Sequence, residues 1–184
     1  MLECGCPEHY PDWHNQDVNL GGQLVHTAPL PMFLHMPLGF EVRAAQQRHT
    51  IEQLGLRERW PGLVLTRSAA FRGQIMRLLE NAVSPARRLE FLPEPFWVRG
   101  YLHEGGVGNL AAPIKHMQSA LLAQGRRPKE LYLCYLTCPR CSARRGGEKI
   151  LLLRRWVESP ALQKRLESSS HAKTQNRKEK IKIM

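Results

Sequence analysis

The sequence has no apolar run that approaches the roughly 18–20 residues needed for a membrane-spanning helix. Residues 1–14 also lack the basic and apolar segments of a secretory signal. Without that route to an oxidising compartment, we expect the chain's five cysteines to form no structural disulfide. Together these absences predict a cytoplasmic protein that is not bound to a membrane.

Several familiar motifs are missing too. We find no His-Glu-x-x-His, no phosphate-binding P-loop, no zinc-finger spacing with paired histidines and no aromatic ribonucleoprotein motif. These absences weigh against common metalloprotease, nucleotide-binding and nucleic-acid-binding classes. The sequence therefore has to be interpreted from its own pattern of apolar runs, glycines and cysteines.

Acidic residues are scarce, with 16 Asp and Glu against 27 Lys and Arg, and the formal net charge is +11. Residues 164–184 hold seven of the basic residues and two of the acidic ones, and we expect them to form a disordered tail. Because a basic tail attracts nucleic acid or an acidic protein, an interaction module stays open as one alternative function.

The order of predicted elements indicates an α+β fold. We expect a leader, a strand, a helix and two strands, and then the same order again, over these ranges: irregular leader 1–31, strand 32–42, helix 43–56, strand 63–66, strand or short helix 72–79, strand 91–102, helix 110–124 and strands 131–136 and 150–153. The ligand-binding domain is then 32–163, with βαββ repeats at 32–80 and 90–156. We expect two antiparallel sheets packed about a pseudo-twofold axis, because each repeat alone leaves an apolar face uncovered.

The loop between the last two strands carries Cys138-Pro139-Arg140-Cys141, a Cys-x-x-Cys turn. A metal knuckle would use Cys138 and Cys141 with Cys4 and Cys6, or with His9, as a structural zinc site that ties the leader to the loop. A redox pair would need a helix N-terminus to activate one thiol, and here we expect only strands. The cysteines can also be unconnected free thiols. Cys134 shares its strand face with core residues.

The second repeat resembles a known family at several segments. His103-Glu104-Gly105-Gly106-Val107-Gly108-Asn109-Leu110 is similar to the H-x-G-x-Y-x-x-L segment of the gyrase-inhibitor-like (GyrI-like) small-molecule-binding domains, and Gly147-Glu148-Lys149-Ile150 resembles their last strand. The resemblance covers residues 90–156. It implies a cleft between the repeats that is lined by aromatic side chains and holds a buried carboxylate for cationic ligands.

By position in that resemblance, the carboxylate is Glu148, and we expect Trp97, Tyr101 and Phe40 as the aromatic walls. An ionised glutamate in an apolar cleft selects for positively charged aromatic ligands. The alternative is that Glu148 pairs with a nearby arginine of the sheet edge, namely Arg144, Arg145 or Arg154.

The sequence thus predicts a cytoplasmic small-molecule-binding protein with Glu148 as its polar anchor and a structural, cysteine-bound zinc ion. A binding protein is favoured over an enzyme. The alternative enzyme is metal-dependent or hydrolytic and uses leader residues such as His14 and Asp17.

Overall fold

The computed structural model describes residues 1–80 and 88–168. Repeat one consists of β2 (Leu24–Phe33), α1 (Phe40–Gln53), β4 (Leu65–Arg67) and β5 (Arg72–Leu78). Repeat two consists of β7 (Trp97–Glu104), α2 (Ala111–Ala123), β8 (Arg126–Tyr135) and β9 (Lys149–Glu158). The shorter elements are β1 (Asp17–Asn19), β3 (Met36–Pro37), β6 (Leu89–Phe91), η1 (Val107–Asn109), α3 (Pro139–Ser142) and η2 (Ala143–Arg145).

Within the described residues, nine strands form one antiparallel sheet, and its central order is β2-β5-β4-β8-β9-β7. This order is unchanged when the two repeats are exchanged, so a pseudo-twofold axis passes between β4 and β8. The repeats meet edge to edge there, where Thr66 pairs with Leu133 and Arg67 with Tyr132. The predicted α+β class with two βαββ repeats is confirmed. The expectation of two sheets packed against each other is wrong, because the β4–β8 pairing joins the repeats into a single sheet.

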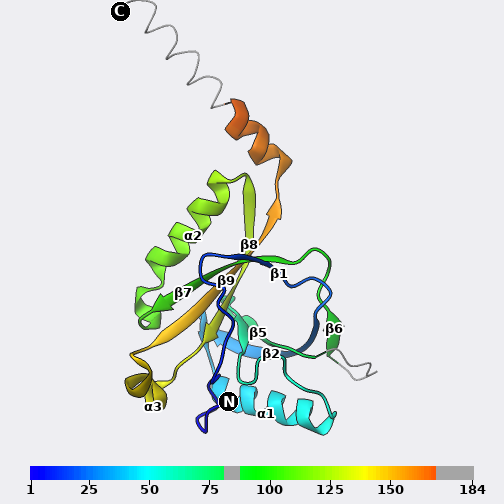
Figure 1. Cartoon of the computed structure of the whole chain (residues 1–184), viewed down its shortest axis with the longest axis vertical. Helices are drawn as coiled ribbons and strands as arrows, with labels where there is room; N and C mark the ends of the chain where they lie inside the picture. The colour runs from blue at the N-terminus through cyan, green and yellow to red at the C-terminus, as the bar shows by residue number, and fades with distance from the viewer. Residues whose placement is uncertain (81–87, 169–184) are drawn as a thin grey trace, which may run out of the picture.

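Both helices lie on the same face of the sheet, and they sit at opposite ends of it (Figure 1). Strand residues alternate between the two faces, as period-two alternation requires. On β9, Ile150 and Leu152 pack under α2, whereas Leu151 and Leu153 belong to the core of the opposite face. Cys134 is fully buried in that opposite core, as predicted from its position on β8.

The leader covers the face of the sheet that carries no helix. Figure 1 shows it running from the N-terminus beside α1 up to β1, which pairs with β7. Its apolar side chains Tyr10, Trp13, Val18 and Leu20 pack on the opposite core. The leader therefore supplies part of the core instead of trailing into solvent.

The first strand begins earlier than predicted. The expected strand at 32–42 is wrong, because β2 ends at Phe33 and Phe40 already starts α1. Pro29 and Pro31 had indicated irregular backbone. Both are exposed residues of β2 that pair with β5 on one side, and neither has a strand partner on the other. Proline is tolerated at such an edge because no ladder hydrogen bond is lost.

The remaining boundaries follow the predictions more closely. Residues 72–78 form a strand, which resolves the predicted choice between strand and short helix. Residues 160–168 are helical, so the first residues of the predicted tail at 164–184 continue this helix. The rest of that tail lies outside the described residues. No described helix has the length and apolar character needed to cross a membrane.

Candidate functional site

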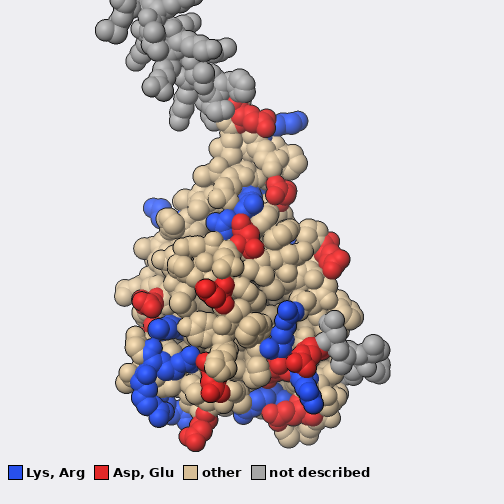
Figure 2. Space-filling view, viewed as in Figure 1, with Lys and Arg blue, Asp and Glu red and all other residues tan. Residues whose placement is uncertain are grey.

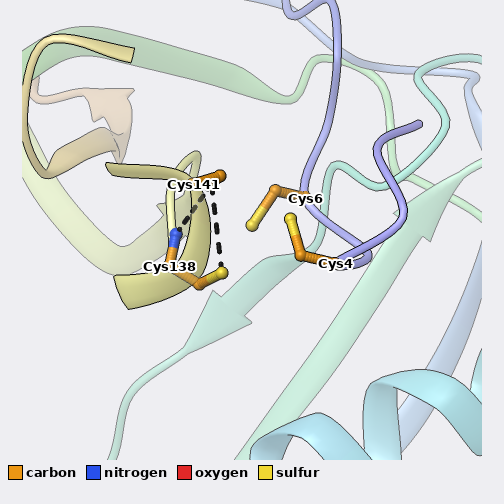
Figure 3. A group of neighbouring side chains, drawn as sticks. All are labelled: Cys4, Cys6, Cys138 and Cys141. Carbon is orange, nitrogen blue, oxygen red and sulfur yellow. Dashed lines mark hydrogen bonds between the residues drawn. The ribbon is translucent and has the colours of Figure 1, made fainter. Parts of the chain in front are cut away.

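Four cysteines meet at the junction of the leader and the β8–β9 loop (Figure 3). The sulfur atoms of Cys4, Cys6, Cys138 and Cys141 all lie within 4.8 Å of one another. The Sγ atoms of Cys138 and Cys141 are 3.9 Å apart. Tetrahedral zinc with Zn–S bonds of about 2.3 Å places its sulfurs about 3.8 Å from one another. The donor set and its spacing therefore fit a closed, four-thiolate metal site, and all four predicted ligands are brought together.

The Cys-x-x-Cys turn is built by the short helix α3. Cys138 is its N-cap residue, and Pro139 occupies the first helical position, where a missing N–H costs nothing. The N–H of Cys138 donates to Cys141 Sγ at 3.3 Å, and the N–H of Cys141 faces the Cys138 sulfur in return. This reciprocal capping points both sulfurs toward the same side. Gly146 and Gly147, both with positive φ, return the chain to β9.

The thiols of this cluster differ in their electrostatics. Burial raises the pKa of Cys6. Burial alone would also raise the pKa of Cys138, but donation from the backbone N–H groups of Arg140 and Cys141 lowers it to about 7. The expectation of strands alone at this turn is wrong, because the short helix α3 begins directly after Cys138.

Basic side chains surround the same loop. Arg140, Arg144 and Arg145 all lie in α3 or η2, and Figure 2 shows Lys and Arg gathered over this part of the molecule. A positive environment favours thiolates, which are the form that binds a metal ion.

Hydrogen bonds from the Arg145 side chain to backbone carbonyls hold the leader against the same loop. Arg145 donates to the carbonyl oxygens of Pro7 at 2.7 Å and Glu8 at 3.3 Å. On the other side, the leader lies against Gly62 of repeat one, where a Cβ would approach Pro7 N to 2.9 Å. Because Gly62 also has a positive φ, glycine serves both the turn and the close approach.

A cavity of about 730 Å³ adjoins the cysteine cluster and lies between the two repeats. Its walls come from the N-terminal half of α1, from η1, from the β8–β9 loop and from leader residues 3–6. A volume of this size matches pockets for drug-sized molecules. The cleft implied by the resemblance therefore exists, and the leader adds a wall that the sequence did not predict.

The charges around the cavity are unevenly neutralised. Three of the four lining cations have carboxylate partners outside the lining: Arg77 with Glu58 at 2.6 Å, Arg48 with Glu52 at 3.8 Å, and Lys149 with Glu104 at 3.7 Å. The fourth, Arg140, has no ion-pair partner in the described part of the chain and donates to Cys4 O. By contrast, the lining carboxylates Glu3, Glu41 and Glu148 have no ion-pair partner in residues 1–80 and 88–168. With three unpaired carboxylates against the single unpaired Arg140, the uncompensated charge at this cavity is negative on balance.

Glu148 lines the cavity, but it is exposed and not buried as expected. It precedes β9, so its carboxylate stands at the rim. A Cβ at residue 106 would overlap Glu148 Oε2, so Gly106 leaves the room for this carboxylate. The alternative pairing with arginine is not observed: Arg145 binds leader carbonyls and Arg154 donates to Lys129 O.

Phe40 lines the cavity as predicted, and its ring contacts Tyr135 edge to face at a centroid distance of 5.4 Å. Phe40 belongs to α1 and Tyr135 to β8, so this aromatic pair joins the two repeats. The prediction missed Tyr135. Strand alternation could have found it, since Tyr135 shares the helix-covered face with Leu131 and Leu133.

Trp97 and Tyr101 do not line this cavity. Trp97 stands at the far end of β7 and stacks on Trp156 with ring centroids 5.6 Å apart. Tyr101 packs under α2 and against His14 at 5.1 Å. The C-terminal end of β7 leads to Gly106, which lines the cavity. Because a strand rises about 3.3 Å per residue, Trp97 and Tyr101 lie too far back along β7 to reach the cavity. Of the aromatic walls predicted, only Phe40 meets Glu148 in one cavity.

The leader residues considered for catalysis are engaged elsewhere. Asp17 accepts hydrogen bonds from Arg99, Arg126 and the indole of Trp156. His14 Nδ1 accepts from the backbone N–H of Leu102. Among the described residues, the four cysteines are the only group of His, Cys, Asp and Glu arranged to hold a metal ion. Asp17 and His14 therefore fasten the leader to repeat two.

Comparison with known proteins supports the fold and places the chain in a family. Residues 2–155 match the family described as "Bacterial hydrolase", and the chain belongs to that family. The crystal structure of the EcmrR C-terminal domain is similar, with a TM-score of 0.53 and 9% identity, over 77% of this chain and 96% of that one. This likeness concerns the fold alone and supports the predicted GyrI-like fold. No curated protein matches the chain.

Proposed function

We propose that this member of the Bacterial hydrolase family binds a cationic, planar small molecule in the cavity between its repeats. The observation that carries the proposal is the cavity itself, with an aromatic pair inside and an unpaired carboxylate at its rim. A positive ring system gains apolar contact with Phe40 and Tyr135 and charge neutralisation from Glu148. Among the described lining residues, Arg140 is the one cation without a carboxylate partner, and three unpaired carboxylates outweigh it.

Binding of rhodamine 6G, a planar cationic dye, tests this function by fluorescence anisotropy. We expect Glu148→Gln to lower its affinity up to about fivefold, which corresponds to the loss of one solvent-screened ion pair. Glu90→Gln changes an exposed carboxylate of β6 outside the cavity and should leave the affinity unchanged. Fluorescein, which is anionic, should bind far more weakly. Equal affinity of the wild type for both dyes would refute the proposed ligand class.

We further propose that the four cysteines hold one structural zinc ion. A tetrahedral site of four thiolates leaves no open position for substrate, so the ion would fasten the leader to the β8–β9 loop. Elemental analysis of protein purified without a histidine tag should give about one zinc per chain. Cys138→Ser and Cys4→Ser should each lose it. Cys134→Ala, which removes the cysteine outside the cluster, should keep it.

Hydrolysis in the same cavity is the second candidate, and membership in the Bacterial hydrolase family favours it. Glu148 would act as a general base toward water, with Tyr135 close to the bound substrate. Turnover of p-nitrophenyl acetate that is lost in Glu148→Gln but kept in Glu90→Gln would support this candidate. Dye binding without any such turnover would favour the binding function alone.

A further inference from the structure

We propose that the metal ion is an effector of the ligand cavity: it holds the leader in place as one wall of that cavity and so raises the affinity for the cationic ligand. This inference rests on the proposed function and adds a regulatory input to it. The effector class is a thiophilic d10 metal ion, of which zinc is the one used in the test.

The metal site and the cavity share residues. Cys4, Cys6 and Cys138 belong to the sulfur cluster and also line the cavity. Between and beside these cysteines, Gly5 and Glu3 form part of the same wall. Displacing the leader therefore opens one side of the cavity and removes a lining carboxylate.

The leader bridges the two repeats. On repeat two, Arg140 donates to Cys4 O at 3.5 Å beside the sulfur cluster. On repeat one, Arg48 of α1 approaches Met1 Sδ at 3.3 Å, and Gly62 contacts residues 5–7. The segment thus crosses from the cysteine loop to α1, beside the cavity that lies between them (Figures 1 and 3).

Apart from the cysteines, residues 1–6 are attached to the rest of the molecule by weak contacts, such as the 3.5 Å bond from Arg140 to Cys4 O. In the described part of the chain, residues 1–16 belong to no helix or strand. Residues 2–6 form a turn through hydrogen bonds of Leu2 N to Cys6 O and Gly5 N to Leu2 O, which give the turn its shape without attaching it to the sheet. Arg145 anchors the chain only from Pro7 onward. Metal–thiolate bonds would therefore be the strongest attachment of residues 3–6.

If the ligand gains contacts only when the leader lies against the cavity, then ligand binding is coupled to binding of the metal that holds the leader there. Coupling is reciprocal: if zinc raises dye affinity by a given factor, dye raises zinc affinity by the same factor. Typical couplings between sites span about 5–150-fold. We expect about tenfold here, because the leader supplies one of several cavity walls.

The test compares rhodamine 6G affinity of the full chain in its zinc-loaded and zinc-free states. We expect about tenfold weaker binding without zinc, and the same factor in zinc affinity, measured against a competing chelator with and without dye. Cys4→Ser should bind dye like the zinc-free wild type, whereas Cys134→Ala should keep the full zinc effect. Equal dye affinity in both states would overturn the proposal.

Amide hydrogen exchange provides a readout that needs no dye. On zinc removal, exchange should accelerate in residues 1–6 and in the cysteine loop, while β9 residues such as Leu152 stay protected. Unchanged exchange in residues 1–6 would overturn the proposal, as would loss of protection throughout the sheet, since the ion would then hold the whole fold. If the zinc-loaded protein binds no dye, the proposed function fails, and the exchange result alone decides whether metal seats the leader.

Discussion

Repeat one and repeat two have the same order of elements, yet they hold their helices on the sheet by different contacts. Leu65 pairs with Met76 across β4–β5, and Tyr132 pairs with Leu153 across β8–β9. All four side chains belong to the same core cluster, so the two pairs occupy equivalent places. Arg77 follows Met76 on β5 of repeat one, and Arg154 follows Leu153 on β9 of repeat two.

The two arginines differ in what they bind. Arg77 is 3% exposed and reaches across to α1, where it donates to Gln47 Oε1 and Ala44 O at 3.2 Å each. Its charge is met by Glu58 at 2.6 Å. Arg154 instead donates to Lys129 O of the neighbouring strand β8. Repeat one thus adds a buried polar network to the apolar contacts that Phe40, Ala44 and Ile51 of α1 make with the sheet.

Repeat two fixes its helix by apolar packing. Leu110 and Met117 pack directly on Leu133, Ile150 and Leu152. Close apolar packing fills the space between helix and sheet. The polar network of repeat one holds α1 at its middle, and side chains of its N-terminal half, Phe40–Arg48, border the cavity. The two helices are thus packed on the sheet in different ways, although the strands beneath them are related by the pseudo-twofold axis. The cavity lies beside α1, where the packing departs from that symmetry.

The largest effect is expected from breaking the polar network. Arg77→Ala leaves the Glu58 carboxylate buried without its partner and should cost about 3–5 kcal/mol of unfolding free energy. Arg154→Ala removes a single hydrogen bond and should cost about 1 kcal/mol. Urea denaturation of both variants measures the difference. Equal losses would mean that the two repeats hold their helices in the same way.

Truncating the apolar contacts of α2 should separate stability from binding. Leu121 is fully buried and does not line the cavity, so Leu121→Ala should cost about 3 kcal/mol while rhodamine 6G affinity stays unchanged. Val42 of α1 lines the cavity and is 61% exposed. Val42→Ala should change stability by less than about 0.5 kcal/mol and weaken dye binding. The reverse pattern would contradict the assignment of the cavity to α1.

A smaller, pH-dependent effect is expected where the leader joins repeat two. Burial alone would raise the pKa of Asp17, but the guanidinium groups of Arg99 and Arg126 hold it below its usual value. A carboxyl with a lowered folded pKa stabilises the protein above its unfolded value of 3.8, and that stabilisation is lost as pH falls through the folded pKa.

Asp17→Asn should therefore cost about 2 kcal/mol at pH 7, where the charged hydrogen bonds to both arginines are intact in the wild type. The difference between the two proteins should shrink below pH 4. Denaturation series at pH 7, 5 and 3 provide the measurement. A difference that is the same at all three pH values would show that charge contributes nothing at this position.

Local sequence patterns determined much of repeat two. The helix expected at 110–124 and the Cys-x-x-Cys turn depend on neighbours within a few residues, and each is found as predicted. The interior position of Cys134 likewise follows from strand alternation. These features were predictable because helix and strand periodicity, capping and positive φ are properties of short segments.

Tertiary structure decided the rest. That Cys4 and Cys6 meet Cys138 and Cys141, that Tyr135 and not Trp97 faces Phe40, and that Glu148 stands exposed at a rim all depend on contacts between distant segments. Even β2 was misplaced, because a proline is acceptable only where an edge lacks a strand partner. The sequence alone supplied the residues of the site. The sheet, its broken twofold symmetry and the path of the leader placed them around one cavity.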